Sequence, residues 1–226
     1  MPMFDVMLND FITLFVILDP LGLVPIFLAL TAGYTVAQRR AIALRASLLT
    51  LAILVLFAVT GLAVLNALGI TLGAFRLAGG LFLFFIGFEL VFERRSERKR
   101  KSASQAAEEH DAGDQDDGDI AAFPLAIPLM AGPGAISAAI LLSGNTQGFA
   151  GMAAHISVIF AAVLATFAFL AVAHQLDRFL GPTSRAVISR LLGVLLAALA
   201  VQFVADGAAA LFHSSAFLVA PATSVG

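Results

Sequence analysis

Hydrophobic residues fill six stretches of this chain that are long enough to cross a lipid bilayer, for which about 20 residues suffice. Short polar segments separate these stretches, and one longer charged segment lies in the middle of the chain. The pattern predicts an all-α, polytopic membrane protein with six transmembrane helices, at Met7–Thr31, Ala41–Leu65, Leu72–Phe92, Ala121–Ser143, Met152–Ala173 and Leu191–Phe212.

The charged segment divides the chain into two halves. We predict a first three-helix unit over residues 1–92, a linker over residues 93–120 and a second three-helix unit over residues 121–226. The linker begins with basic residues and ends with acidic ones. Because it has almost nothing apolar to bury, we expect it to be disordered. Its acidic run lacks the register of an EF-hand loop, so a solvated linker is favoured over a calcium site.

Each half opens with a hydrophobic stretch that Pro and Gly interrupt. The first interruption reads Asp-Pro-Leu-Gly at residues 19–22, and the second reads Gly-Pro-Gly at residues 132–134. Pro removes a backbone donor and Gly adds backbone freedom, so both helices should be broken there. A half with three spans ends on the opposite side of the membrane from where it began. We therefore predict two inverted three-helix repeats with broken first helices, an architecture that suits a central solute site.

Composition narrows the class of protein. The chain is 60% hydrophobic and 12% charged, with a mean hydropathy of +0.98, whereas soluble domains are about 25% charged. It has no cysteine, no histidine pair at metal-ligand spacing and no visible nucleophile–base set, so we expect no metal, no cofactor and no enzymatic activity. No basic stripe indicates nucleic acid. The expected partners are the bilayer and a small-molecule substrate, and the sequence leaves a homo-oligomer open.

The basic residues predict how the chain is oriented. Three arginines fall in the first loop, six cations in the third and three arginines in the fifth, which makes twelve of the 13 Lys and Arg residues. Alternate loops share one side of the membrane, so these three loops lie together and Arg76 remains on the other side. The positive-inside rule then makes the linker cytoplasmic and puts both termini outside.

Asp19 is the leading candidate for contact with a substrate. An ionisable group in the middle of a span is costly and by default suggests a function. Asp19 would accept hydrogen bonds from a substrate ammonium or take up a proton, while the alternative is that it caps a half-helix beginning at Pro20. Pro20 and Gly22 complete the candidate site of the first half.

The second half offers backbone groups in place of a charge. Gly132, Pro133 and Gly134 allow a half-helix to begin whose free N–H groups favour a carboxylate, and the alternative is a packing kink. Ser137, one turn further on, is a candidate donor to substrate, or it bonds back to its own helix. Gln202 in the sixth span is also included, with an interhelical hydrogen bond as the favoured alternative.

Three segments resemble the MarC family (UPF0056-type) of bacterial inner-membrane proteins. They are FRLAGGLFLFFIGF at residues 75–88, PLAIPLMAGPGAI at 124–136 and ISRLLGVLLAALAVQFVADG at 188–207. The resemblance covers nearly the whole chain apart from the linker and the last dozen or so residues. It implies six spans and a link to amino-acid exporters, and some members are described as transporters of small neutral amino acids. The family's first motif commonly reads Asp-Pro-x-Gly-Asn-x-Pro, and Leu23 takes the Asn position here.

We therefore predict an integral protein of the bacterial inner membrane that acts as a secondary transporter of small solutes such as neutral amino acids. The sequence leaves the direction of transport, import or export, open. A channel is the first alternative, because breaks that line a continuous pore would have the same sequence pattern. A non-transporting scaffold or regulator is the second alternative, with the charged linker as its docking element.

The charge distribution generates a testable topology. Reporter fusions should place Lys101 in the cytoplasm and Gly226 outside, because twelve of the 13 basic residues share the linker's side. Alkaline phosphatase and green fluorescent protein fusions at both positions measure this directly. A cytoplasmic Gly226 would contradict both the number of spans and the inverted repeat.

Overall fold

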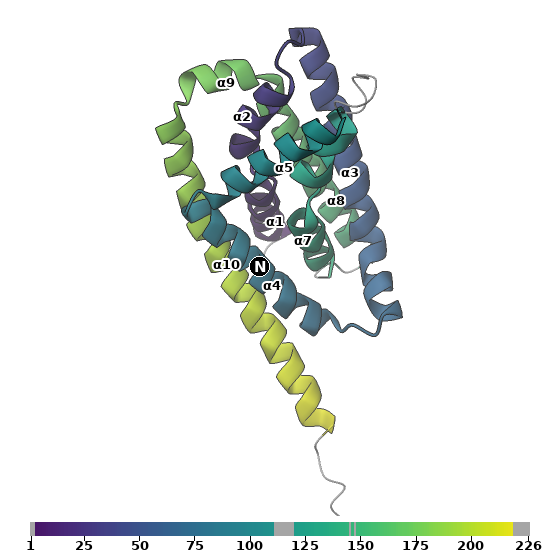
Figure 1. Cartoon of the computed structure of the whole chain (residues 1–226). Coiled ribbons are helices and arrows are strands. Elements are labelled where there is room, and N and C mark those ends of the chain that lie inside the picture. Colours follow the sequence, from purple (N-terminus) through teal and green to yellow (C-terminus); the bar gives the residue numbers. More distant parts are fainter. Residues whose placement is uncertain (1–2, 111–119, 145, 147, 219–226) are drawn as a thin grey trace, which may run out of the picture.

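The computed structural model describes residues 3–110, 120–144, 146 and 148–218, and every regular element in these ranges is a helix (Figure 1). The first half contains α1 (Met3–Leu18), α2 (Pro20–Leu30), α3 (Val36–Ala67), α4 (Leu72–Val91) and α5 (Arg94–His110). The second half contains η1 (Ala121–Met130), α7 (Pro133–Ser143), α8 (Gly148–Ala171), α9 (Ala173–Phe179) and α10 (Pro182–Leu218).

Five helical segments of the described chain are long and apolar enough to cross a membrane, namely Phe4–Leu30, Val36–Ala67, Leu72–Val91, Gly148–Ala171 and Thr183–Phe212. A sixth candidate is the pair of η1 and α7, which is bent by 59° at its break. Each predicted stretch therefore corresponds to one candidate span, and the prediction of an all-α polytopic membrane protein is confirmed. The inverted relation of the two halves stays a prediction.

Glycines let α4 and α10, the third candidate spans of the two halves, pack closely along their length (Figure 1). A Cβ atom added at Gly87 would lie 2.8 Å from the carbonyl oxygen of Gly193, and one added at Gly80 would lie 2.8 Å from the amide nitrogen of Val204. Small residues at helix contacts allow such close backbone approach in membranes, where apolar burial alone gives little drive for association.

The linker differs from its prediction over its described part. Residues 94–110 form α5, which packs against α2, α4 and η1, so the expectation of disorder is wrong there, and residues 111–119 lie outside the described part of the chain. Arg95, Lys99 and Ala103 are buried and stand four residues apart, on one helical face. The expectation failed because it counted only apolar groups as a reason for order, whereas this face is fixed largely by cations.

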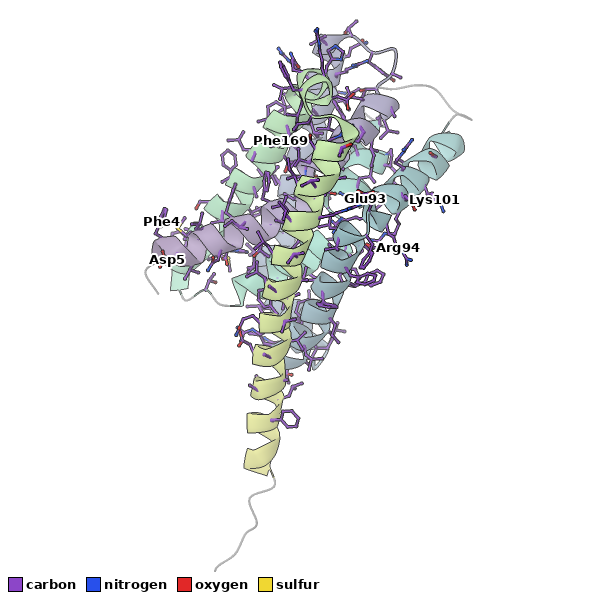
Figure 2. The ribbon with its side chains drawn as sticks, turned by 90° about the vertical axis from the view of Figure 1, so that its left-hand side faces the viewer. Phe4, Asp5, Glu93, Arg94, Lys101 and Phe169 are labelled. Carbon is purple, nitrogen blue, oxygen red and sulfur yellow. The ribbon has the colours of Figure 1, made fainter. Side chains whose placement is uncertain are left out.

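The helix α5 lies on the side of the molecule opposite the start of α1. Figure 2 shows Phe4 and Asp5 at one end of α1, and Arg94 and Lys101 on the far side of the bundle. The other end of α1 therefore points toward α5. This arrangement brings the linker to the break between α1 and α2.

The contact between α4 and α10 generates a stability prediction. Gly87→Ala should destabilise the fold by about 1–3 kcal/mol, because its methyl group would meet backbone atoms that cannot move aside easily. Gly181→Ala is the matched control, since a Cβ atom there meets nothing within 4 Å. Thermal unfolding in detergent compares the two variants. Equal melting temperatures would contradict the proposed role of the close contact.

Candidate functional site

Asp19 forms the break between α1 and α2. Its backbone is left-handed, with φ 54° and ψ 61°, and its Oδ1 accepts a hydrogen bond from the amide nitrogen of Gly22 at 3.0 Å. Asp19 thus caps α2, and Pro20 occupies the first helical position, where its missing N–H has no consequence. A Cβ atom at Gly22 would collide with the Asp19 carboxylate, which explains why a glycine stands at this position.

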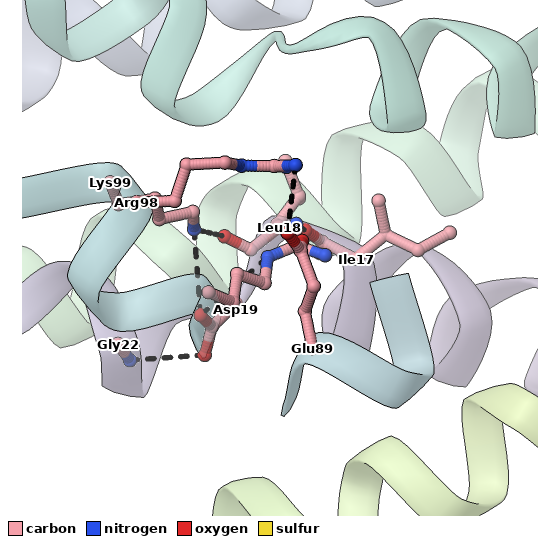
Figure 3. A network of polar contacts seen from close by, with 8 residues as sticks. Ile17, Leu18, Asp19, Gly22, Glu89, Arg98 and Lys99 are labelled. Carbon is pink, nitrogen blue, oxygen red and sulfur yellow. Dashed lines mark hydrogen bonds and ion pairs between the residues drawn. The ribbon is translucent and has the colours of Figure 1, made fainter. Parts of the chain in front are cut away.

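The break leaves carbonyl groups at the end of α1 without helical partners, and two cations of α5 bind them. Arg95 Nη2 donates to the carbonyl oxygen of Ile17, and Lys99 Nζ donates to that of Leu18 at 3.3 Å (Figure 3). Cations are favoured at a helix C-terminus because the exposed carbonyls carry partial negative charge. The linker therefore satisfies backbone groups that could not face lipid.

The same two cations pair with Asp19. Lys99 Nζ lies 3.5 Å from Oδ2 of Asp19, and Arg95 Nε lies 4.0 Å from the same oxygen. All three residues are buried, with exposures of 4% for Asp19, 6% for Arg95 and 7% for Lys99. Breaking such a buried pair by removing one partner is costly because the other charge stays buried.

Burial acts on both cations. It lowers the pKa of Lys99 to about 8, against the opposing effect of Asp19, so the ammonium is still mostly protonated at pH 7. Burial also lowers the pKa of Arg95 from its ordinary value. A third cation of α5, Arg98, is half-exposed. Its Nη1 lies 2.9 Å from Oε1 of buried Glu89.

The second break lies between η1 and α7. Gly132 caps α7 without a side-chain hydrogen bond, and Pro133 occupies the first helical position, as Pro20 does in α2. A Cβ atom at Gly134 would collide with Ile86 and lie 3.7 Å from Cγ2 of Ile17. The start of α7 is thus held close to the end of α1, and the two breaks approach each other.

A cavity of about 300 Å³ lies where the two breaks meet. Three cations of α5 form one wall, namely Arg95, Arg98 and Lys99. The opposite walls come from the end of η1, the start of α7, and apolar side chains of α1 and α4, with lining residues Ile17, Phe82, Ile86, Pro128, Leu129, Met130, Gly132, Pro133, Gly134 and Ala135. Its size is at the lower end of that of small-molecule sites.

The predicted site residues divide into two groups. Gly132, Pro133 and Gly134 line the cavity, while Asp19, Pro20 and Gly22 form the adjoining break and are buried behind the cations of α5. Within the described chain the lining residues do not include Ser137 or Gln202. Ser137 is half-buried one turn along α7.

Gln202 is placed away from the site, on the exposed side of α10. Its Nε2 donates to Oδ1 of Asp206 at 2.8 Å, one turn further along the same helix. Gln202 thus makes a hydrogen bond within α10 in place of the interhelical hydrogen bond that the sequence favoured. Leu23, which stands at the family's Asn position, is fully buried in an apolar cluster with Phe27 and Leu125.

Sequence reasoning missed Arg95 and Lys99 as site residues. Their signal was the spacing of four from Arg95 through Lys99 to Ala103, which puts all three on one face of a helix. The spacing was overlooked because all six cations of the segment were expected to be solvated. In the described part of the chain, no group of three or more His, Asp and Glu residues is arranged to hold a metal ion.

Comparison with known proteins agrees with this architecture. Residues 4–212 match the family described as MarC family integral membrane protein. The chain is 38% identical to the UPF0056 membrane protein YvbG of Bacillus subtilis (strain 168), over 93% of this chain and 97% of that protein. It is 36% identical to a UPF0056 membrane protein of Aquifex aeolicus (strain VF5), over 87% and 89% of the two chains.

A further relative is the UPF0056 membrane protein YhcE of Escherichia coli (strain K12), which is 31% identical over 92% of this chain and 94% of that protein. No solved structure matches the chain. The family match covers both broken helices, the linker and nearly all of α10. The protein is therefore a multi-pass integral membrane protein that belongs to the MarC family.

Proposed function

We propose that this protein is a secondary transporter of small solutes such as neutral amino acids, and that it moves them rather than chemically converting them. The observation that carries the proposal is the cavity of about 300 Å³ between two interrupted helices. In transporters, substrate sites form at broken helices whose free backbone groups face the solute. Here the start of α7 and the end of α1 contribute to the same cavity wall.

The neighbours of each element support an inverted-repeat arrangement. The helix α3 packs on η1 and α7, and α8 packs in the corresponding way on α1 and α2. Likewise α4 packs on α7, and α10 packs on α2. Equivalent helices thus have equivalent partners in the opposite half, as expected for two repeats that rock about a central site.

The transport proposal includes a location and an orientation. The protein lies in the bacterial inner membrane, with both termini outside and α5 on the cytoplasmic side. The position of α5 opposite the start of α1 agrees with that orientation (Figure 2). In this orientation α5 covers the cavity from the cytoplasm, and opening toward the cytoplasm requires α5 to leave the end of α1.

Asp19 has two roles in this proposal. It caps α2 through the Gly22 amide, and its second oxygen holds Lys99 when the site is covered. When α5 leaves, that oxygen becomes available to a substrate ammonium or a proton. Capping and transport therefore use different oxygens of the same carboxylate.

The transport role of Asp19 is testable by Asp19→Asn. Asn caps about as well as Asp, but it removes the charge and the titratable proton. Solute flux in proteoliposomes should fall about tenfold or more, because hydrogen bonds to charged groups contribute about 1.5–3 kcal/mol and 1.4 kcal/mol corresponds to a factor of ten. Flux should be measured against a panel of labelled neutral amino acids, with and without a proton gradient.

Asp5→Asn is the matched control, since Asp5 is exposed near the start of α1, the helix that ends just before Asp19, and the flux of this variant should stay unchanged. Asp19→Ala is the companion variant, because it removes both roles and should also cost about 1 kcal/mol through the lost cap. Normal flux in Asp19→Asn would end the assignment of a transport role to this residue. Flux that is not saturable and ignores gradients would favour a channel instead.

A further inference from the structure

We propose that the cavity between α5 and α7 binds a small carboxylate anion, which Arg95 and the first N–H groups of α7 hold. This inference deepens the transport proposal, and its reading as a substrate site rests on that proposal. The binding itself does not depend on transport.

The cavity wall carries an excess of positive charge. Its lining residues include three cations, whereas Asp19 and Glu89, the carboxylates that pair with them, are not among the lining residues. Oδ2 of Asp19 lies 3.5 Å from Lys99 Nζ and 4.0 Å from Arg95 Nε. Three cations thus face two carboxylates, and a monoanion in the cavity would balance the remaining positive charge.

Arg95 supplies donors that lack an acceptor. Its Nη2 donates to the carbonyl oxygen of Ile17, but its Nη1 and Nε are buried and have no hydrogen-bond partner among the described residues. A buried donor without a partner is costly, and more so when it is charged. A carboxylate in the cavity would accept a hydrogen bond from the free Nη1, and such charge-assisted hydrogen bonds are roughly twice as strong as neutral ones.

The start of α7 supplies backbone donors on the other side. The first backbone bond of this helix runs from the amide of Ile136 to the carbonyl of Gly132. The amides of Gly134 and Ala135 precede that bond, so they have no carbonyl one turn back within the helix. Gly132 has no side chain that caps them. Free amides and the helix dipole both favour a negative charge at this end.

The rest of the wall is apolar and limits what the anion carries. Ile17, Phe82, Ile86 and Met130 line it, and they offer no partner to a second charge. A small carboxylate with a short apolar group therefore fits both parts of the wall. Inorganic phosphate is also an anion but has no apolar part. It is therefore the alternative ligand that the binding experiment must distinguish from a carboxylate.

Direct binding to the full-length protein in nanodiscs tests the proposal. Isothermal titration calorimetry should be run with propionate, alanine, alaninamide and inorganic phosphate. Propionate should bind, because it carries a carboxylate beside a short apolar group. Alanine should bind more weakly, because the wall offers its ammonium no partner, and alaninamide should not bind, because its carboxylate is replaced by an amide. Binding of alaninamide equal to that of propionate, or of phosphate without either carboxylate, would overturn the proposal.

Variants identify the residues that hold the anion. Arg95→Gln should weaken propionate binding about tenfold or more. Arg94→Gln is the matched control, since Arg94 is exposed on the same helix and is not a lining residue. Because Arg95 also binds the carbonyl of Ile17, its loss could unfold the protein. Arg98→Gln then serves as the second variant, since its side chain is 53% exposed, and it should also weaken binding.

The results separate this inference from the transport proposal. Carboxylate binding that Arg95→Gln abolishes, together with no flux in proteoliposomes, would support the site and contradict transport. Saturable flux of substrates without any carboxylate would support transport and contradict the site. Equal propionate affinity of Arg95→Gln and Arg94→Gln, with both proteins folded, would also overturn the assignment.

Discussion

The structure depends on satisfying backbone groups where helices are interrupted inside an apolar bundle. A continuous helix pairs its own amides and carbonyls, but the break at Asp19 frees the carbonyls of Ile17 and Leu18. Lipid offers no hydrogen bonds, so these groups require partners from the protein. Cations of α5 provide them, and the Asp19 carboxylate balances those cations. Three polar requirements are thus met by one set of contacts (Figure 3).

This arrangement gives the linker a role in the site. Burial of Arg95 and Lys99 in an apolar bundle would be costly without the carbonyls at the end of α1 and the carboxylate of Asp19. Conversely, the break would be unstable without the helix. The pairing couples the segment that joins the two halves to the centre of the first half, and α5 also packs on η1 in the second half. Movement of α5 would therefore change contacts at both breaks and at the cavity between them.

Much of the fold could be predicted because its signals are local. Length and hydropathy predicted the spans, and Pro20, Gly22 and the Gly132–Gly134 turn marked where helices are interrupted. The prediction of a disordered charged segment was wrong for residues 94–110, because order there comes from pairing with groups distant in the sequence. The same reason hid Arg95 and Lys99. Hydropathy alone does not show which face of a long helix looks inward, so the hydrogen bond of Gln202 to Asp206 within α10 could not be predicted.

Lys99 and Asp19 stabilise each other across the break between α1 and α2. A double-mutant cycle on the free energy of unfolding tests it most directly, with Asp19→Asn, Lys99→Gln and the double variant compared with the unmodified protein. We expect a coupling of about 0.5–3 kcal/mol, so that Lys99→Gln costs less once Asp19 is replaced. The same cycle with exposed Lys101 in place of Lys99 should be additive. Additive effects of the Asp19 and Lys99 substitutions would contradict the account.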